Sequence, residues 1–222
     1  MSARILKNTP ISGESPEVHF GEHFKQSLWV EFVDNVFEKW NGCFECEYPK
    51  LFHGVLLDKE NKTALVVSSG VGHLIDIENR KLLFKTEDHP AIESAVSTTN
   101  PDYFIAGTYC SVYVFDNKKL IKEVEADGLV DGIYFKFQVD RKVTGDLVTI
   151  DNPFDFHLDF EFDLDTFELT IDKSKIQEQY YIQRKLNDVG RKSMTEKNIF
   201  RRLIVTIRST TSFGIKNNDY NL

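Results

Sequence analysis

Polar and apolar side chains alternate without a break over residues 155–165, the most regular segment of the chain. Because a β-strand points successive side chains to opposite faces, a strand here would place Phe and Leu on one face and ionisable groups on the other. Like charges in a row repel one another, so we expect this row either to be a solvated outer face or to bind an oppositely charged partner. The candidate partner-binding residues are Asp155, His157, Asp159, Glu161, Asp163 and Asp165.

The same row offers ligand atoms for a metal ion, with His157, Asp159 and Glu161 as the best set. Same-face residues of one strand lie about 7 Å apart, which is too wide for chelation unless a neighbouring strand adds a ligand. The sequence names no such ligand, and we assign no metal and no cofactor. A metal-assisted hydrolase that uses these three residues is the alternative function.

Two shorter motifs contain residue types that bind metals. Cys43 and Cys46 form a C-x-x-C pair, but residues i and i+3 of a strand face opposite ways, and no second pair follows at zinc-finger spacing. His19 and His23 are spaced i, i+4, yet Gly21 weakens a helix there and the Glu between them is not placed as in H-E-x-x-H. Nucleophile-elbow, P-loop and dinucleotide motifs are also absent from the sequence, so we assign no catalytic residue and do not expect an enzyme.

Charge is distributed unevenly along the chain. The formal net charge is −8. The region 173–208 is basic, with ten basic residues against three acidic ones. The region 151–172 has no Lys or Arg and eight acidic residues, which are Asp151, Asp155, Asp159, Glu161, Asp163, Asp165, Glu168 and Asp172. The charge that a partner meets is therefore a local property, an acidic region followed at once by a basic one.

The acidic balance argues against nucleic acid and against an anionic membrane surface as partners. We expect instead a non-catalytic protein that binds another macromolecule, in particular a basic protein. By analogy with small acidic inhibitors, the most specific hypothesis is an immunity protein that blocks a nuclease-like toxin. Self-assembly through the acidic and basic segments is a further alternative.

The sequence also predicts a cellular location. No run of about 18 apolar residues, the length that a membrane helix needs, occurs in it. The first residues lack the apolar core of a signal peptide, and three cysteines do not match the even count of a disulfide-stapled secreted domain. We expect a cytoplasmic protein that folds as a single domain over residues 1–222.

From residue 51 onward, short apolar segments rich in Val, Ile and Phe are separated by turn-forming residues. Asp76 and Asp116 each end the third segment of a group of four, 40 residues apart, and Asp163 follows 47 residues later. Four strands about every 40 residues are typical of propeller blades. The region 51–172 is thus predicted to contain repeated β units.

The stretch from about Leu51 to Asp172 resembles the blades of WD-repeat and other β-propeller proteins in its layout, and Gly72-His73 resembles the Gly-His pair of such repeats. The resemblance implies a scaffold that binds other proteins. We predict a mainly β fold, namely a propeller-like antiparallel meander of four-stranded units, with a β-sandwich or a barrel as the alternative.

The two ends of the chain are expected to differ. Residues 1–20 are predicted to be an irregular segment. Residues 175–189 show the periodicity of one C-terminal helix. An apolar segment at 202–208 could add a closing strand to the ring of blades.

Residues 22–40 fit two templates. Their apolar side chains recur at i, i+4 and i+8, as in an amphipathic helix. They also fit two strands at 28–33 and 36–40, with Asn41-Gly42 as a hairpin turn into a third strand at 43–48. We favour the strands, which would supply most of a fourth blade.

Overall fold

The computed structural model describes residues 1–21, 26–99, 102–126, 130–149 and 157–172. The chain divides into two compact units, Met1–Asp172 and Lys173–Leu222, and the described residues all belong to the first. The expected helix at 175–189 and closing strand at 202–208 lie outside the described residues.

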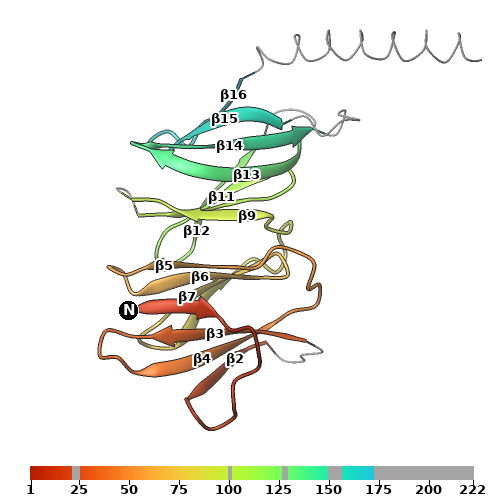
Figure 1. The fold of residues 1–222 in the computed structure, drawn as a ribbon. Helices are drawn as coiled ribbons and strands as arrows, with labels where there is room; N and C mark the ends of the chain where they lie inside the picture. Colours follow the sequence, from red (N-terminus) through yellow and green to blue (C-terminus); the bar gives the residue numbers. More distant parts are fainter. Residues whose placement is uncertain (22–25, 100–101, 127–129, 150–156, 173–222) are drawn as a thin grey trace, which may run out of the picture. The chain divides into compact units, whose positions relative to one another are not determined.

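Sixteen strands make up the regular structure of the described residues, and they form four sheets of four strands (Figure 1). Sheet 1 has the strand order β1 (Ser2–Ile5), β3 (Ser27–Val33), β4 (Lys39–Glu45), β2 (Glu17–Phe20). Sheet 2 contains β5 (Gly54–Asp58), β6 (Thr63–Ser68), β7 (Val71–Asp76) and β8 (Lys81–Lys85). Sheet 3 contains β9 (Ser94–Ser97), β10 (Phe104–Gly107), β11 (Ser111–Phe115) and β12 (Leu120–Glu125). Sheet 4 contains β13 (Val130–Val139), β14 (Lys142–Thr149), β15 (His157–Asp163) and β16 (Leu169–Ile171).

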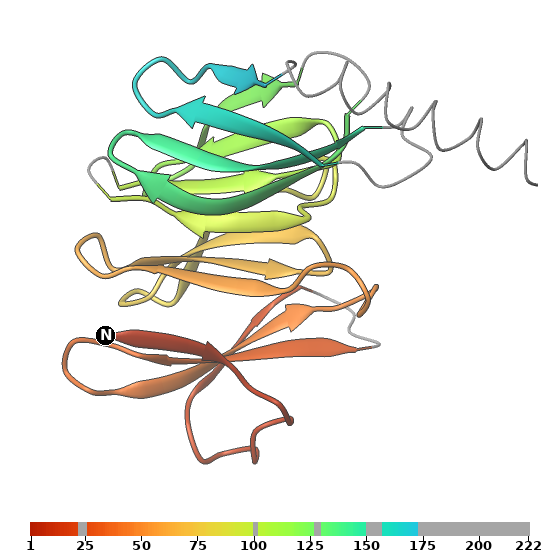
Figure 2. The ribbon, with the colours of Figure 1, turned by 45° about the horizontal axis from the view of Figure 1, so that its top comes forward.

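Sheets 2, 3 and 4 are antiparallel meanders whose strands are neighbours in chain order. This confirms the prediction of a mainly β fold built of four-stranded units over residues 51–172, and none of the sheets closes into a barrel. The layout is compatible with blade-like repeats. Figure 2 shows the four sheets following one another in chain order.

Sheet 1 corrects the prediction for the N-terminus. Residues 1–20 are not irregular throughout, because they supply β1, antiparallel to β3, and β2, parallel to β4. Met1, Ala3, Val18 and Phe20 of these segments pack on the core between sheets 1 and 2. Strands of four residues are too short to show a period in the sequence, especially when a polar loop separates them.

The preferred strand interpretation of residues 22–40 is confirmed by β3 and by β4, which starts at Lys39, but the position of the hairpin turn is wrong. Asn41 and Gly42 lie inside β4, and the turn occupies residues 34–38. A Cβ on Gly42 would stand 2.8 Å from the Phe44 ring and 3.0 Å from the Phe32 ring. Glycine is therefore needed here for close packing and not for a turn.

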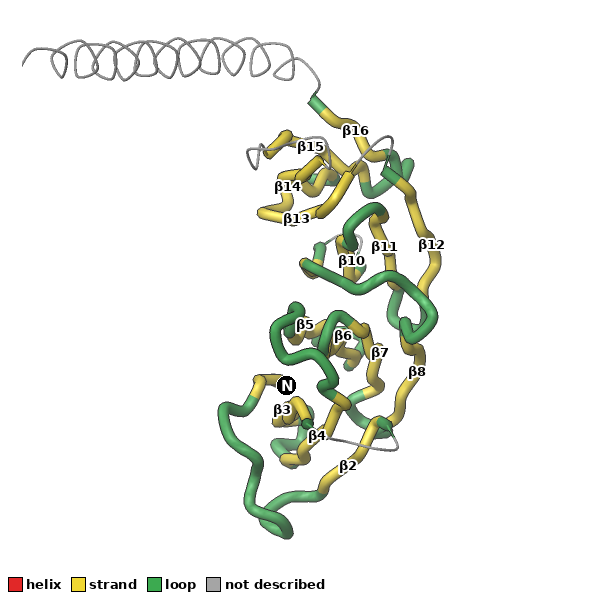
Figure 3. Tube along the Cα trace, turned by 90° about the vertical axis from the view of Figure 1, so that its right-hand side faces the viewer, coloured by secondary structure: helices red, strands yellow, loops and turns green. Residues whose placement is uncertain are grey.

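Burial separates the inner sheets 2 and 3 from sheet 4. In β6, β10 and β11 every residue is buried, whereas in β15 only alternate residues are buried. One apolar cluster joins sheets 1 and 2, and a second joins sheets 2 and 3. Sheet 4 contacts sheet 3 through the bond of 2.7 Å that the Ser94 hydroxyl donates to the Ile133 carbonyl. The strands β2, β8 and β12 are the edge strands of sheets 1, 2 and 3, and they lie along one side of the described unit (Figure 3).

Candidate functional site

The alternating row of residues 155–165 lies on β15 and the turn after it. Leu158, Phe160 and Phe162 are buried, as predicted. Asp159 and Glu161 are exposed on the opposite face, which we call the outer face of sheet 4. His157 and Asp163 also belong to this face, Asp165 follows in the turn, and Asp155 lies outside the described residues.

Cations of the neighbouring strands pair with this row. The strand register places Thr144 opposite Glu161 and Asp146 opposite Asp159. Lys142 Nζ lies 2.6 Å from a Glu161 oxygen, and Lys136 Nζ lies 2.6 Å from an Asp146 oxygen. The pair of Lys142 with Glu161 is open to solvent at both partners, so it adds little stability. Both pairs interrupt the row of like charges, so the outer face is a mixed surface with an excess of carboxylates.

The last two carboxylates of the row shape a turn. Asp163 Oδ1 accepts hydrogen bonds from the backbone N–H groups of Asp165 and Thr166, at 2.8 and 3.0 Å. These bonds hold the pKa of Asp163 below its usual range. Arg141 donates to both carboxylate oxygens of Asp165, and this bond raises the pKa of the guanidinium. Asp163 therefore has a structural role that the sequence pattern alone does not reveal.

The same turn design recurs in the other sheets. Asp76 Oδ1 accepts the Asn79 N–H at 2.9 Å, and Asp116 Oδ1 accepts the N–H groups of Lys118 and Lys119 at 2.7 and 2.8 Å. A carboxylate that bonds the backbone two or three residues ahead is a common turn device. The regular spacing of these aspartates is thus a requirement of the turn between the third and fourth strands.

An apolar strip lies beside the charged residues on the outer face. Tyr134, Phe137 and Val139 of β13 are 37, 56 and 53% exposed, and the register places them opposite Asp146, Thr144 and Lys142. Sequence reasoning missed this strip because a bulge between Phe135 and Phe137 breaks the alternation. These residues and the charged groups of β14 and β15 together form the candidate site.

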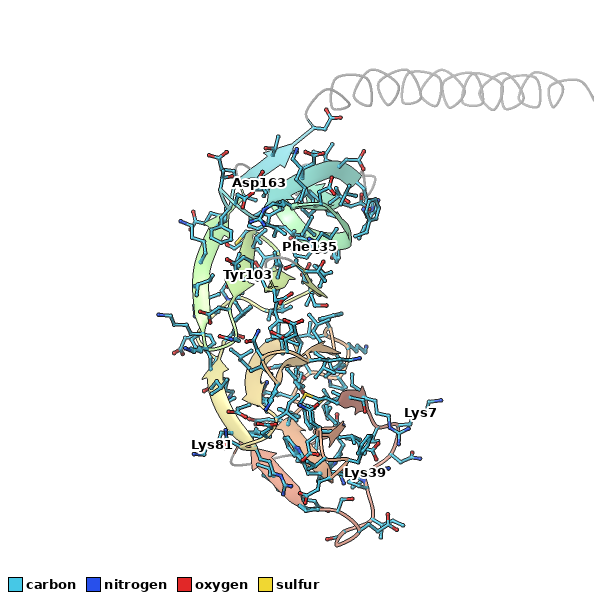
Figure 4. All side chains as sticks on the ribbon, turned by 90° about the vertical axis from the view of Figure 1, so that its left-hand side faces the viewer. Lys7, Lys39, Lys81, Tyr103, Phe135 and Asp163 are labelled. Atoms are coloured by element: carbon cyan, nitrogen blue, oxygen red, sulfur yellow. The ribbon has the colours of Figure 1, made fainter. Side chains whose placement is uncertain are left out.

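The residues next to the bulge contact buried neighbours. Phe135 turns inward, where its ring meets Phe160 edge-on with 5.6 Å between the centroids. Burial and a hydrogen bond with Glu93 raise the pKa of Tyr134 to about 12. Figure 4 labels Phe135 of β13 and Asp163 at the end of β15. The exposed strip therefore rests on a packed aromatic layer.

The candidate metal ligands are engaged elsewhere. His157 Nδ1 lies 3.8 Å from an Asp146 oxygen, and Glu161 pairs with Lys142. In the part of the chain that the structure describes, no group of three His, Cys, Asp or Glu residues could hold a metal ion. The described residues of the outer face are engaged in ionic contacts.

The two cysteines of the C-x-x-C motif are separate free thiols. Cys43 lies within β4, opposite Trp29 and His19 in the register, and burial raises the pKa of its thiol. Cys46 follows the end of β4, with its sulfur 3.9 Å from His53 Nε2 and 3.5 Å from the hydroxyl oxygen of Ser69.

A Cys–His pair of this kind raises the question of nucleophilic catalysis. The Ser69 backbone N–H donates to His53 Nδ1 at 3.2 Å, so in the neutral ring the proton sits on Nε2, 3.2 Å from the Pro49 carbonyl oxygen. A nitrogen that carries a proton neither accepts the thiol proton nor ligates a metal. The pair therefore serves the connection between sheets 1 and 2.

No family model matches the chain, and no curated protein matches it. Among 28 matching chains of known structure is one of hydrazine synthase from Kuenenia stuttgartiensis, with 17% identity and a TM-score of 0.41. The alignment covers 56% of this chain and 36% of that one. No helix of the described residues is long and apolar enough to cross a membrane.

Proposed function

We propose that this protein binds a basic partner protein through the outer face of sheet 4. The observation that carries the proposal is the exposed apolar strip of Tyr134, Phe137 and Val139 beside a surface rich in carboxylates. Protein interfaces combine aromatic residues at the centre with a charged rim. An apolar centre supplies affinity, and the carboxylates select a positively charged partner and speed its approach.

The charges of this face favour a basic partner over an acidic one. Five carboxylates lie on or beside it, namely Asp146, Asp159, Glu161, Asp163 and Asp165, against the three cations Lys136, Arg141 and Lys142. Because the pair of Lys142 with Glu161 is solvent-exposed, a partner cation can replace this lysine at small cost. The blade-like layout, if it is of the WD-repeat type, fits a protein-binding scaffold.

The most specific form of the proposal is an immunity protein that blocks a nuclease-like toxin. A nuclease must present a cationic surface to its substrate. An acidic face with an apolar strip is complementary to such a surface, as in other tight inhibitor complexes.

The test is photo-crosslinking from position 137 in the full chain, with position 83 as the control. Leu83 of β8 is also exposed, at 39%, but lies in another sheet. We expect one protein adduct from position 137 that position 83 does not give. The same adducts from both positions would contradict the proposal.

The identified partner is then purified and its binding kinetics are measured against salt concentration. Glu161→Lys and Asp159→Lys should lower the association rate about tenfold at low salt. Glu60→Lys, in the exposed turn after β5, is the matched control and should have a much smaller effect. Asp163 is left intact, because its carboxylate holds the turn. Unchanged rates for the β15 variants would refute the acidic contribution.

A further inference from the structure

The turn between β3 and β4 exposes two large apolar side chains at its tip. Val36 is 73% exposed and Phe37 is 83% exposed, the highest value among the exposed large hydrophobic residues. Neither side chain can contribute much to the core at this exposure, because the hydrophobic effect follows the area removed from water.

The tip is a well-defined loop. Asp34 Oδ1 accepts the N–H groups of Val36 and Glu38, both at 2.9 Å. The Asp34 N–H donates to the Glu38 carbonyl at 3.1 Å, and the Phe37 N–H donates to the Asp34 carbonyl at 3.3 Å. Arg80 of the neighbouring sheet pairs with Glu38 at 3.2 Å. A tip that is ordered in advance loses little conformational entropy when it binds.

Phe37 also has an unfavourable backbone conformation. Its φ is +65°, in the left-handed region that glycine and asparagine adopt easily and that bulky residues avoid. Strain of this kind is common at binding sites. For the stability of the turn alone, glycine at this position would serve better.

The turn between β15 and β16 contains a matched residue. Phe167 has a φ of +56° and also follows a capping aspartate, Asp163. Its ring packs on Phe162 and Tyr103, with centroids 6.3 and 5.8 Å away. Phe167 therefore stabilises the fold, whereas Phe37 is exposed in the equivalent position.

We propose that Val36 and Phe37 form an anchor that inserts into an apolar pocket, rimmed by basic residues, on a partner protein. Rigid aromatic side chains that fill a pocket are the usual hot spots of protein interfaces. The carboxylate of Asp34 lies at the base of the tip and is the charge that matches a basic rim. This surface belongs to sheet 1, at the other end of the row of sheets, and the proposal does not depend on the function proposed for sheet 4.

A protein fits this tip better than an anionic membrane does. Membrane-inserting tips combine apolar residues with free cations that bind anionic headgroups. Here the cation Arg80 pairs with Glu38, and Lys39, labelled in Figure 4, lies 3.9 Å from Glu31. The nearby cations are thus already paired with carboxylates.

Thermal unfolding of the full chain tests whether Phe37 serves the fold. Phe37→Gly relieves the left-handed strain and leaves no cavity, so its midpoint should equal that of the wild type or exceed it by about 2–4 °C. Phe167→Gly relieves the same strain but removes a packed ring, and its midpoint should fall. A fall of similar size in both variants would overturn the proposal.

Photo-crosslinking from position 37 in the producing cells tests for the partner, with position 62 as the control. Lys62 shares the positive φ, at +59°. We expect a protein adduct specific to position 37. With that protein purified, Phe37→Gly should weaken binding at least about tenfold. Phe37→Leu should retain most of the affinity.

Three results would overturn the proposal. The first is the absence of any adduct above that of the control position. The second is an adduct with the mass of two copies of this chain. The third is binding of the wild type, but not of Phe37→Gly, to vesicles of phosphatidylcholine and phosphatidylglycerol. Binding of the same partner to Phe137→Ser is measured as well. A loss of binding that arises at sheet 4 is thereby distinguished from a loss that arises at the tip.

Discussion

Acid should destabilise this protein through one buried histidine, His73 of β7. Its side chain is buried against the Phe44 ring of sheet 1, with ring centroids 5.2 Å apart. Nδ1 lies 3.2 Å from the Val71 carbonyl oxygen, to which it donates its proton in the neutral ring. Nε2 is buried with no hydrogen-bond partner in the described part of the chain. A second proton would place a charge on this buried ring, and the backbone of Val66 offsets only part of that cost.

Burial, helped by the charge of Lys85 and opposed by the backbone of Val71 and Val66 and by Glu87, lowers the pKa of His73 from 6.5 to about 4. The unfolded chain thus binds this proton more readily than the folded one. The stabilisation that the folded protein gains from a neutral His73 is complete above pH 6.5. It is lost as the pH falls toward 4. The full loss is about 3 kcal/mol, since one pKa unit corresponds to about 1.4 kcal/mol. At pH 5 the loss is about 2 kcal/mol.

Urea unfolding at pH 8 and pH 5 measures this effect. Other groups also titrate, so the quantity of interest is the difference between two proteins in their loss of unfolding free energy. His73→Gln removes the imidazole and should lose about 2 kcal/mol less than the wild type between the two pH values. A constant destabilisation by the substitution cancels in this comparison. An equal loss in both proteins would refute the reasoning.

His157→Gln is the matched control. It removes an imidazole from the exposed face of β15, where water solvates the side chain in the folded and unfolded states alike. We expect it to keep the pH dependence of the wild type. If it flattened the profile as much as His73→Gln, burial would not be the cause.

Two further substitutions test the fold. Gly107→Ala places a Cβ 2.3 Å from the Ile133 carbonyl oxygen. Since backbone must move to relieve this contact, chemical denaturation should show a loss of about 2 kcal/mol or more in the free energy of unfolding. Asp76→Ala removes the bonds of 2.9 and 2.8 Å to Asn79 and should cost about 1 kcal/mol in the same assay. An unchanged unfolding midpoint would mean that the carboxylate does not hold the turn.

Sheets 2 and 3 could be predicted from the sequence because their order follows from local signals. Each strand is a short apolar segment, and each turn contains residues such as Asp58 and Asn61, which bond one another in the structure at 2.7 Å. Sheet 1 could be predicted only in part: β3 and β4 are expected from the sequence, but β2 lies parallel to β4 after a loop, and Asn41-Gly42 has the sequence of a hairpin turn although it lies within β4. Strand pairing of that kind depends on tertiary packing, which local propensity does not predict.

The candidate site shows the same division. The alternation of β15 predicts correctly which side chains of this strand are buried and which are exposed. The pairing of Glu161 with Lys142 depends on the register between two strands, and the exposure of Phe137 depends on a bulge. The αL conformation of Phe37 depends on the hydrogen bonds of its turn. None of these three features has a sequence pattern of its own.

The difference in burial between the inner sheets and sheet 4 can nevertheless be predicted from the sequence. Strands buried on both faces are continuously apolar, as in Ala64–Val67, and strands buried on one face alternate, as in β15. A further apolar sheet packed on sheet 4 would have to remove Glu161 and Lys142 from water. Desolvation of such a pair is costly. The face of sheet 4 that resists another sheet is therefore the one that remains hydrated and open to a charged partner.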